Sequence, residues 1–232
     1  MTQLPRKADV EFSEPVSRLW GERLRQAMND SYMGVPLLKL PEDLRVYEHI
    51  LWMANVSTVI ELGTHLGGSA LWFRDRLRTL ASYGRIDVVR VVSIDLDNDR
   101  ARWQLRRVDR SYAEQITLLD GDICDPGLPS RVERFVGPGA VLVVEDSAHT
   151  FETTLAGLNG FSGFVSPGSF YVAEDGCVDV EEMRVDPSFP RGVIPAVRQW
   201  LGSAQGRGFL PRPDLELYGL TCHREGYLQR EG

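Results

Sequence analysis

The chain has 232 residues, of which 43% are hydrophobic and 25% charged, and its formal net charge is −7. This length can bury one substantial α/β core but hardly two, so we expect a single main domain. An acidic chain repels a phosphate backbone, which argues against nucleic acid as a substrate or partner.

The N-terminus and the cysteines indicate the compartment. Residues 1–7 lack the apolar core of a signal peptide, and no apolar run approaches the ~20 residues of a membrane span. Cys124, Cys177 and Cys222 are widely spaced and form no C-x-x-C pair, so the sequence indicates neither a disulfide framework nor a zinc site. We therefore expect a cytoplasmic protein with reduced thiols and no membrane contact.

Residues 1–30 are expected to form an N-terminal extension, and residues 31–232 the main domain. Within the extension, residues 1–12 are expected to be disordered or loosely packed, and a helix is predicted from Ser13, with Pro15 in its first turn. This helix can pack on the core, cover the site or pair with a second subunit. We expect a homo-oligomer, although the sequence does not separate these roles.

A loop punctuated by glycine and proline, residues 31–41, leads into a helix that Pro41 opens. The acidic residues Glu42 and Asp43 suit the first turn of that helix because of its dipole. Lys39, one of two lysines beside 24 arginines, precedes the helix. Two interpretations of Lys39 stay open: a solvated surface lysine, or a contact to a ligand carboxylate or to the substrate.

Residues 57–70 predict a buried strand that runs through a glycine-rich turn into a helix. The β-branched run 58–60 suits a strand buried on both faces, and the glycines allow a sharp turn and a close approach to a ligand. The helix N-terminus at Gly68 and Ser69 offers unpaired backbone N–H groups to an anion. The same pattern also fits a plain tight turn between a core strand and its helix.

The spacing in this turn indicates the ligand class. A dinucleotide-binding turn requires a second glycine where His65 stands, and a phosphate-binding P-loop requires a lysine before Ser69. The turn resembles the E-x-G-x-x-x-G-x-S turn of class I S-adenosylmethionine (SAM)-dependent methyltransferases. The residues of the turn that are expected to bind SAM are Glu61, Gly63, Thr64, Gly67 and Ser69.

Two further predicted strands lead to acidic residues. The strand over residues 88–94 ends at Asp95, where a carboxylate can accept hydrogen bonds from both hydroxyls of a ribose; Asp97 is the alternative. After the next strand, the methyltransferase interpretation assigns Asp122 and Ile123 to the adenine. The Asp and Gly residues there also fit an ordinary β-turn.

The strand predicted over residues 140–146 ends in acids, and a further strand ends at Glu174 and Asp175. A helix separates these strands and makes them parallel neighbours, so their acidic ends meet at the same edge of the sheet as the glycine turn. Asp146, Glu174 and Asp175 would repel one another without a cation, and an all-oxygen set favours Mg²⁺, with Ca²⁺ or Mn²⁺ as lesser candidates. The alternative is that the acids cap exposed strand ends. Consecutive residues can address one point only if the backbone leaves strand geometry, which Gly176 eases.

His149 follows Asp146 by three residues, so both side chains lie on one side of a turn. A hydroxyl that attacks a sulfonium methyl group must lose its proton, and a histidine can accept that proton near neutral pH. We therefore predict His149 as the catalytic base, with Asp146 beside it in the catalytic site. A purely structural histidine is the alternative.

Asp146, Glu174 and Asp175 are called the acidic cluster below. After this cluster, residues 177–189 form an irregular stretch that we expect to be a substrate lid. A helix is predicted over residues 193–201, and a closing pair of strands over residues 215–221 and 226–229. His223 lies between these two strands and is interpreted as a turn residue.

Several motifs together resemble the cephalosporin hydroxylase and rhamnosyl O-methyltransferase family, which is linked to macrolide sugar O-methyltransferases of antibiotic biosynthesis. The motifs are Gly34-Val35-Pro36, Pro41-x-Asp43-Leu44, Glu61-Leu62-Gly63-Thr64, Gly67-Gly68-Ser69-Ala70-Leu71-Trp72, Asp146-Ser147-x-His149-Thr150, Ser166-Pro167-Gly168-Ser169, Val172-x-Glu174-Asp175 and Gly226-Tyr227-Leu228-x-Arg230. The resemblance implies Mg²⁺ on the three carboxylates, a base at His149, and SAM along the turn and at Asp95 and Asp122. His65 departs from the tyrosine that is common in the family.

The fold that this resemblance implies is the three-layer αβα, Rossmann-like class I methyltransferase fold: a seven-stranded, mostly parallel sheet whose last strand is antiparallel. The expected activity is SAM- and Mg²⁺-dependent transfer of a methyl group to a hydroxyl of a vicinal diol, on the sugar of a small-molecule natural product. Three alternatives stay open: a metal-independent methyltransferase, an accessory methoxylation enzyme of the cephalosporin type, and a non-catalytic SAM-binding partner subunit.

Overall fold

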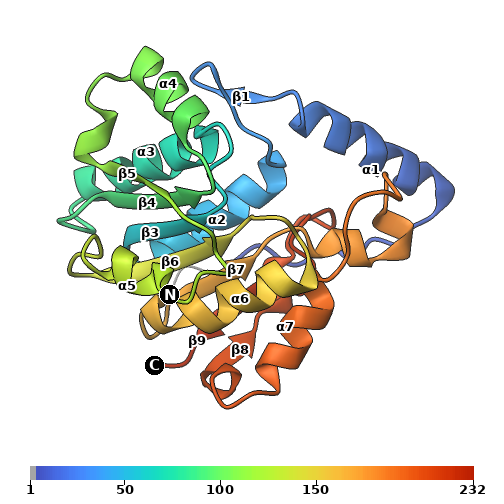
Figure 1. The fold of residues 1–232 in the computed structure, drawn as a ribbon. Coiled ribbons are helices and arrows are strands. Elements are labelled where there is room, and N and C mark those ends of the chain that lie inside the picture. The colour runs from blue at the N-terminus through green and yellow to red at the C-terminus, as the bar shows by residue number, and fades with distance from the viewer. Residues whose placement is uncertain (1–3) are drawn as a thin grey trace.

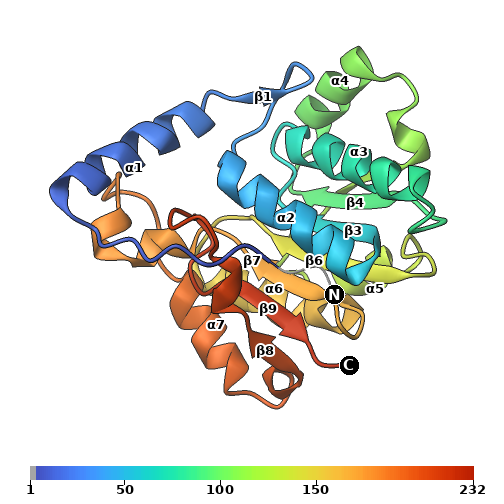
Figure 2. The same cartoon turned by 180° about the vertical axis from the view of Figure 1, so that it is seen from behind.

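The computed structural model describes residues 4–232 and arranges them in three layers, a central sheet with helices on both faces (Figures 1 and 2). The main sheet has seven strands in the order β5-β4-β3-β6-β7-β9-β8. The last strand, β9, pairs antiparallel with both of its neighbours, and the other pairs in this sheet are parallel. The predicted mostly parallel sheet with an antiparallel last strand is confirmed.

The elements follow one another in the alternating order of an α/β domain. The strands of the main sheet are β3 (Val56–Leu62), β4 (Arg90–Asp95), β5 (Ile116–Asp120), β6 (Ala140–Glu145), β7 (Phe170–Ala173), β8 (Phe209–Pro211) and β9 (Tyr227–Arg230). The helices are α1 (Glu14–Ala27), α2 (Pro41–Ala54), α3 (Gly68–Ser82), α4 (Asp99–Val108), α5 (Leu128–Glu133), α6 (Phe151–Phe161) and α7 (Val193–Leu201). A short hairpin, β1 (Ser31–Tyr32) and β2 (Val35–Pro36), lies where the sequence predicts a loop. Among residues 4–232, no helix combines the length and apolar character needed to cross a membrane.

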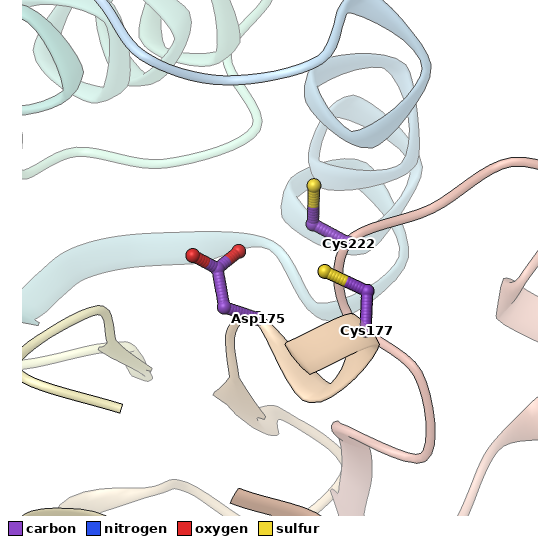
Figure 3. Close-up of side chains that lie close together, drawn as sticks. All are labelled: Asp175, Cys177 and Cys222. Carbon is purple, nitrogen blue, oxygen red and sulfur yellow. The ribbon is translucent and has the colours of Figure 1, made fainter. Parts of the chain in front are cut away.

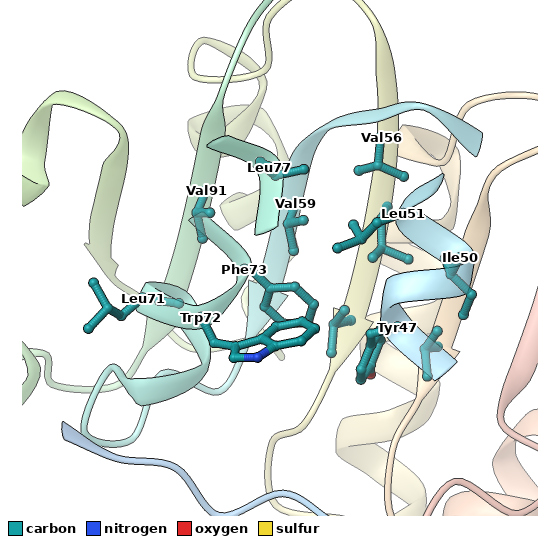
Figure 4. Close-up of a cluster of buried hydrophobic side chains, with 14 of the residues drawn as sticks. Tyr47, Ile50, Leu51, Val56, Val59, Leu71, Trp72, Phe73, Leu77 and Val91 are labelled. Carbon is teal, nitrogen blue, oxygen red and sulfur yellow. The ribbon is translucent and has the colours of Figure 1, made fainter. Parts of the chain in front are cut away.

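The two faces of the sheet are packed by different helices. In β3, Val59 belongs to the core that includes α2 and α3, and Ile60 to the core that includes α5, α6 and α7. Figure 4 shows the first of these cores, where Tyr47 of α2 and Phe73 of α3 meet edge to face with ring centroids 5.0 Å apart. This packing fixes α3, which begins at the glycine turn, against the sheet.

The N-terminal extension lies against distant parts of the chain. The backbone N–H of Ala8 donates to the carbonyl of Leu217 at 2.9 Å, so residues 4–12 are not detached from the domain; residues 1–3 fall outside the described part of the chain. Helix α1 projects from the body of the molecule (Figure 1). It is anchored by Trp20, whose Nε1 donates to the carbonyl of Met183 at 2.7 Å.

The strand predicted over residues 215–221 is wrong. The partner of β9 is instead β8, which forms the edge of the sheet, and residues 213–215 form a 3₁₀ turn. Pro211, the last residue of β8, has no N–H to donate, and this suits an edge strand.

Glu216 explains why residues 215–221 are not a strand. A half-buried strand would expose Glu216 between the buried side chains of Leu215 and Leu217, yet Glu216 is only 3% exposed. Its carboxylate pairs with Lys7 at 3.3 Å and with Arg224 at 2.7 Å. Ion pairs and the N-terminal extension therefore hold this segment in place of a sheet ladder.

Candidate active site

A cavity of about 310 Å³ lies at the carboxyl ends of the central strands, where the glycine turn and one of the acidic ends meet. Ligands of open α/β sheets bind at this edge because the loops there leave a crevice. The predicted site residues that line the cavity are Gly63, Asp95, Asp122, Ile123 and Asp146.

The glycine turn depends on two close backbone approaches. Gly63 has φ +108°, and a Cβ there would lie 1.9 Å from the carbonyl oxygen of Asp146. Gly67 has φ +85° and precedes the first residue of α3. A Cβ at Gly68 would lie 2.0 Å from the carbonyl oxygen of Pro36, so the loop after β2 packs directly on the turn.

Asp95 holds the turn from the neighbouring strand. Its Oδ2 accepts hydrogen bonds from the backbone N–H groups of Thr64 at 3.0 Å and His65 at 2.8 Å, and its Oδ1 accepts the next N–H along its own chain. A carboxylate has about four acceptor sites, so one remains for a ligand hydroxyl. Asp97, the alternative, accepts an N–H two residues on and lies outside the cavity lining.

Asp122 and Ile123 lie on the cavity wall, and Asp122 also shapes its own turn. Its Oδ1 accepts the backbone N–H of Cys124 at 2.9 Å, which is the hydrogen bond of an Asx turn. The β-turn interpretation and the ligand interpretation are therefore compatible, since the turn itself presents both residues to the cavity.

Glu61 lies beneath the turn, fully buried, and is not among the residues that line the cavity. Its carboxyl group contacts the hydroxyls of Ser69 and Ser93. Burial raises the pKa of Glu61 to about 7, while the nearby Lys39 acts in the opposite direction. Thr64 extends this network, because its hydroxyl lies 2.7 Å from that of Ser93.

His149 lies among carboxylates at the end of β6 and β7. Its Nε2 is 3.9 Å from Oδ1 of Asp146 and 3.5 Å from Oδ2 of Asp175. One potential metal-ligand atom from each of the three residues lies within 4.8 Å of the others. Burial lowers the pKa of His149, but Asp175 and Asp146 outweigh it, so the pKa is raised above the usual 6.5.

Glu174, the third predicted metal ligand, is engaged by two residues that the sequence does not pair with it. Its Oε2 accepts a hydrogen bond from Lys39 Nζ at 2.6 Å, and its Oε1 accepts one from the hydroxyl of Tyr47 at 2.5 Å. Lys39 also donates to Oδ2 of Asp146 at 2.9 Å and is only 4% exposed. The interpretation of Lys39 as a solvated surface lysine is therefore wrong.

His223 lies in a turn, as predicted, but it is buried beside the acidic cluster. Its Nε2 is 3.8 Å from Oε2 of Glu174 and 3.8 Å from Oδ2 of Asp43, and its Nδ1 faces the backbone N–H of Asp175 at 3.4 Å. One potential ligand atom from each of Glu174, Asp175 and His223 lies within 4.8 Å of the others. Two histidines, His149 and His223, thus lie close to Asp175.

The donor set fits a hard divalent cation. Two sets of potential ligand atoms join these carboxylates: Asp146 with His149 and Asp175, and Glu174 with Asp175 and His223. Among residues 4–232, the three predicted carboxylates do not form a single set of this kind, but carboxylate oxygens are the ligands that Mg²⁺ prefers. The pKa of Asp146 is raised first by burial and then by repulsion from Glu174. A bound cation would relieve that repulsion.

The backbone reaches this geometry through left-handed residues. His65, His149 and Asp175 have φ of +48°, +56° and +59°, which non-glycine residues rarely adopt. The departure from strand geometry that the consecutive acids require occurs at Asp175 itself. Gly176, the next residue, allows close packing instead, since a Cβ there would lie 2.0 Å from the carbonyl oxygen of Arg224.

Two of the three cysteines lie next to Asp175 (Figure 3). The backbone N–H of Cys177 donates to the carbonyl of Cys222 at 2.9 Å, and both thiols are buried, whereas Cys124 is exposed. The side-by-side position of Cys177 and Cys222 ties the segment after β7 to the segment before β9. No spacing pattern in the sequence indicates this contact.

The predicted lid, residues 177–189, is organised by one arginine. Arg184 donates to the backbone carbonyls of Val178 at 2.6 Å, Pro187 at 2.7 Å and Phe189 at 3.0 Å. The ring of Phe189 stacks on that of His149 with centroids 5.6 Å apart. The lid therefore reaches the predicted base.

Sequence reasoning missed three of these contacts. Tyr47 and Phe189 were not predicted as site residues, and His223 was interpreted only as a turn residue. The only available signal concerned Lys39, a rare lysine in a loop that precedes the first strand of the main sheet.

Comparison with known proteins places this arrangement in a family. The model of the family described as "Rhamnosyl O-methyltransferase/CmcI" matches residues 25–231. Rhamnosyl O-methyltransferase of Mycobacterium tuberculosis (strain H37Rv) is 26% identical over 172 residues, which cover 73% of this chain and 65% of that protein. The protein of the same name from Mycobacterium leprae is 24% identical over 203 residues, covering 87% of this chain and 83% of the relative.

Solved structures show the same fold. CmcI with Mg and SAM has a TM-score of 0.64 at 22% identity, covering 100% of this chain and 93% of that one. MycE, a methyltransferase of the mycinamycin biosynthetic pathway in complex with Mg, S-adenosylhomocysteine (SAH) and mycinamycin VI, has a TM-score of 0.52 at 18% identity, covering 98% of this chain and 56% of that one. The expected class I methyltransferase fold is thereby confirmed, and the match of the family model over nearly the whole chain shows that this protein belongs to the rhamnosyl O-methyltransferase/CmcI family.

Proposed function

We propose that this protein is a SAM- and Mg²⁺-dependent O-methyltransferase that acts on a hydroxyl of a sugar-bearing small molecule. The observation that carries this proposal is the position of Asp146. Its side chain lines the cavity at the glycine turn and also belongs to the acidic cluster around His149. A methyl donor in the cavity and an acceptor at the cluster would therefore be neighbours.

SAM is assigned to the cavity of about 310 Å³. Gly63 lines the cavity and leaves room for the carbonyl of Asp146, Asp95 retains one acceptor site for the ribose, and Asp122 and Ile123 form the wall that suits an adenine. Glu61 and Ser69 support the turn from below. MycE and CmcI, with the same fold, bind SAH or SAM.

Mg²⁺ is assigned to Asp146, Glu174 and Asp175. When bound there, the ion would hold the acceptor oxygen and lower the pKa of its hydroxyl. The proposed acceptor of the hydroxyl proton is His149, and its stacking on Phe189 and its proximity to Asp175 support this role. SAM in the cavity would supply the methyl group: the acceptor oxygen would bond to the methyl carbon as the carbon–sulfur bond breaks, with SAH as the leaving group and the proton on His149.

The substrate class is inferred from chemistry and from the named relatives. An ion held by carboxylates can bind two adjacent oxygens, which suits a vicinal diol of a sugar better than an isolated alcohol. The curated relatives are rhamnosyl O-methyltransferases, and MycE is described with mycinamycin VI. We therefore expect a glycosylated natural product as the acceptor.

The test is product mass analysis after incubation with SAM, Mg²⁺ and a panel of glycosylated natural products. We expect a mass gain of one methyl group that disappears with EDTA and in Asp146→Asn, but not in Asp99→Asn, which changes an exposed acid on α4. A panel without any methylated product, despite SAM binding by calorimetry, would favour a non-catalytic SAM-binding subunit.

One contact favours a second candidate, a metal-independent methyltransferase. Both oxygens of Glu174 already have donors, Lys39 and Tyr47, so an internal cation occupies part of the acidic site. Full activity in EDTA and in Asp146→Asn would decide for this alternative.

A further inference from the structure

Lys39 is the internal cation of the acidic site. Its Nζ lies 2.6 Å from Oε2 of Glu174 and 2.9 Å from Oδ2 of Asp146, and its side chain is almost entirely buried. The two carboxylates come from different strand ends, and the ammonium bridges them. Of the two lysines in the chain, this is the one placed among the predicted metal ligands.

The segment that carries Lys39 is held in place from both ends. The carbonyl of Pro36 packs against Gly68 at the start of α3, and the N–H of Leu37 donates to Asp30 at 3.0 Å. Directly after Lys39, the chain enters α2, whose Tyr47 binds the other oxygen of Glu174. The segment that carries Lys39 is therefore packed on both sides, and this packing fixes the position of the ammonium beside the two carboxylates.

A cation at this position reduces the repulsion between the carboxylates of Asp146 and Glu174. Asp146 and Glu174 both accept from the same ammonium, Glu174 being buried and Asp146 about one-quarter exposed, and their like charges repel each other. The ammonium of Lys39 neutralises part of this repulsion. A divalent ion needs oxygens of the same two residues, and it repels an ammonium beside it.

We propose, building on the proposed function, that Lys39 holds Asp146 and Glu174 in place before Mg²⁺ binds and competes with the ion for these carboxylates. Binding of the ion displaces the ammonium from at least one of its two partners. Lys39 is thus a positioning residue that sets the affinity of the metal site. The opposing possibility is a purely structural tie that metal binding does not disturb.

The first test compares Lys39→Met and Lys39→Gln with the wild type. Mn²⁺ binding is followed by electron paramagnetic resonance, and thermal unfolding is measured in EDTA and in Mn²⁺. We expect both variants to bind Mn²⁺ at least about tenfold more tightly, because the competing charge is gone. Their melting temperature should fall in EDTA and recover in Mn²⁺, by more than the wild type gains.

The matched control is Lys7→Met. Lys7 is the other lysine and pairs with Glu216, outside both the cavity and the acidic cluster. This variant should bind Mn²⁺ as the wild type does, and its melting temperature should change equally in EDTA and in Mn²⁺.

The second test uses the unaltered protein and does not depend on the folding of any variant. Isotope labelling of lysine gives two side-chain signals in a nuclear magnetic resonance spectrum, one from Lys39 and one from Lys7. Titration with Mg²⁺ should shift the Lys39 signal and speed the hydrogen exchange of its ammonium, while the Lys7 signal stays in place. Binding of Mg²⁺ by calorimetry without any change at Lys39 overturns the inference.

The outcomes separate this inference from the proposed function. If the wild type binds Mn²⁺ and the Lys39 variants bind it equally or more weakly, the inference fails and the proposed function stands. If only the Lys39 variants bind Mn²⁺, the inference holds and the metal-dependent function fails. If no form binds Mn²⁺ or Mg²⁺, both fail.

Discussion

His149 has the surroundings of a general base whose protonation responds to its neighbours. Burial alone would lower the pKa of this imidazole, but Asp175 and Asp146 raise it above 6.5. A base must be neutral to accept a proton, so activity requires a pH above this raised pKa. The ring is further fixed by its stacking on Phe189.

We expect His149→Ala to lower the rate of methyl transfer by about 10²–10⁴-fold while SAM affinity changes little, because the base does not hold the cofactor. In the wild type, the rate should increase as the pH rises above 6.5. The measurement is a pH profile of kcat beside SAM binding by calorimetry. His49→Ala, on α2 near Tyr218, serves as the control and should keep the activity. Equal rates for both variants would contradict the assignment of the base.

Glu61 gives a prediction about stability. Its pKa is raised by burial from 4.5 to about 7, so the folded chain binds more protons than the unfolded chain between these values. This contribution to stability is therefore complete below about pH 4.5 and is lost as the pH rises to about 7. Glu61→Gln removes the titrating group and with it up to about 3 kcal/mol of pH dependence.

The measurement for Glu61→Gln is urea unfolding of the metal-free protein at several pH values from 5 to 8. The free energy of unfolding should fall less steeply with pH in the variant than in the wild type. Glu48→Gln, which changes a partly exposed carboxylate on α2, should keep the wild-type slope. Identical slopes in all three proteins would disprove the buried titration.

Sequence reasoning found the acids at the strand ends but not the cation between them. Asp146, Glu174 and Asp175 follow predicted parallel strands, and topology alone places such residues at one edge. Lys39 lies 107 residues from one partner and 135 from the other, and a buried lysine has no local pattern. Its role follows only from the packing of the loop on the glycine turn.

At the scale of elements, the segment after β7, residues 177–189, is a strap: Arg184 holds its backbone in one conformation, so it is not a free loop. The guanidinium donates to four backbone carbonyls and so sets the position of Phe189 over His149. The sequence predicted this segment as a lid because it is irregular and lies at the ligand edge. The contacts of Arg184 could not be predicted, because every residue has a backbone carbonyl and the sequence does not show which carbonyls an arginine will bind.

We expect Arg184→Ala to release the strap and raise KM for the acceptor roughly fivefold, the value of about 1 kcal/mol of lost ring stacking, with SAM affinity unchanged. Steady-state kinetics with varied acceptor and calorimetry with SAM measure the two effects. Arg191→Ala removes an exposed arginine two residues beyond this segment, paired only with Glu181 among the contacts described, and should leave KM unchanged. A loss of SAM affinity in Arg184→Ala would contradict the assignment of the strap to the acceptor side.

The elements that could be predicted are those whose burial pattern is local. Helix α7 begins and ends within a residue of the predicted 193–201, and α2 begins at Pro41 as its turn chemistry indicates. The prediction of a closing strand at residues 215–221 was wrong. Leu215, Glu216 and Leu217 alternate between apolar and charged residues as in a half-buried strand, but Glu216 is buried and paired with Arg224. Long-range ion pairs are the physical reason for both this error and the missed role of Lys39.

At the scale of the whole molecule, α1 stands away from the sheet (Figures 1 and 2). Only Trp20, Gly21 and Ala27 of its residues are buried, whereas Leu19 and the following Met28 are more than half exposed. An arm with exposed apolar side chains suits contact with a second copy of the chain. The homo-oligomer stays a prediction.

Light scattering after size exclusion should therefore give a mass above the 26.1 kDa of one chain. The double change Leu19→Glu and Met28→Glu should shift the mass to that of the monomer, because a buried charge opposes association. Tyr83→Glu places the same charge on an exposed residue at the end of α3 and should not change the mass. A monomeric wild type would rule out the oligomer.

The left-handed backbone at His149 and Asp175 has a consequence for how this scaffold can be engineered. These conformations are set by the strand ends and their turns, so they constrain the choice of residue even where no ligand is bound. A random library selected only for folding should lose β-branched residues at both positions and retain glycine and asparagine. New acceptor preferences are therefore better sought in the lid at Phe189, whose ring stacks on His149 and whose backbone is not left-handed.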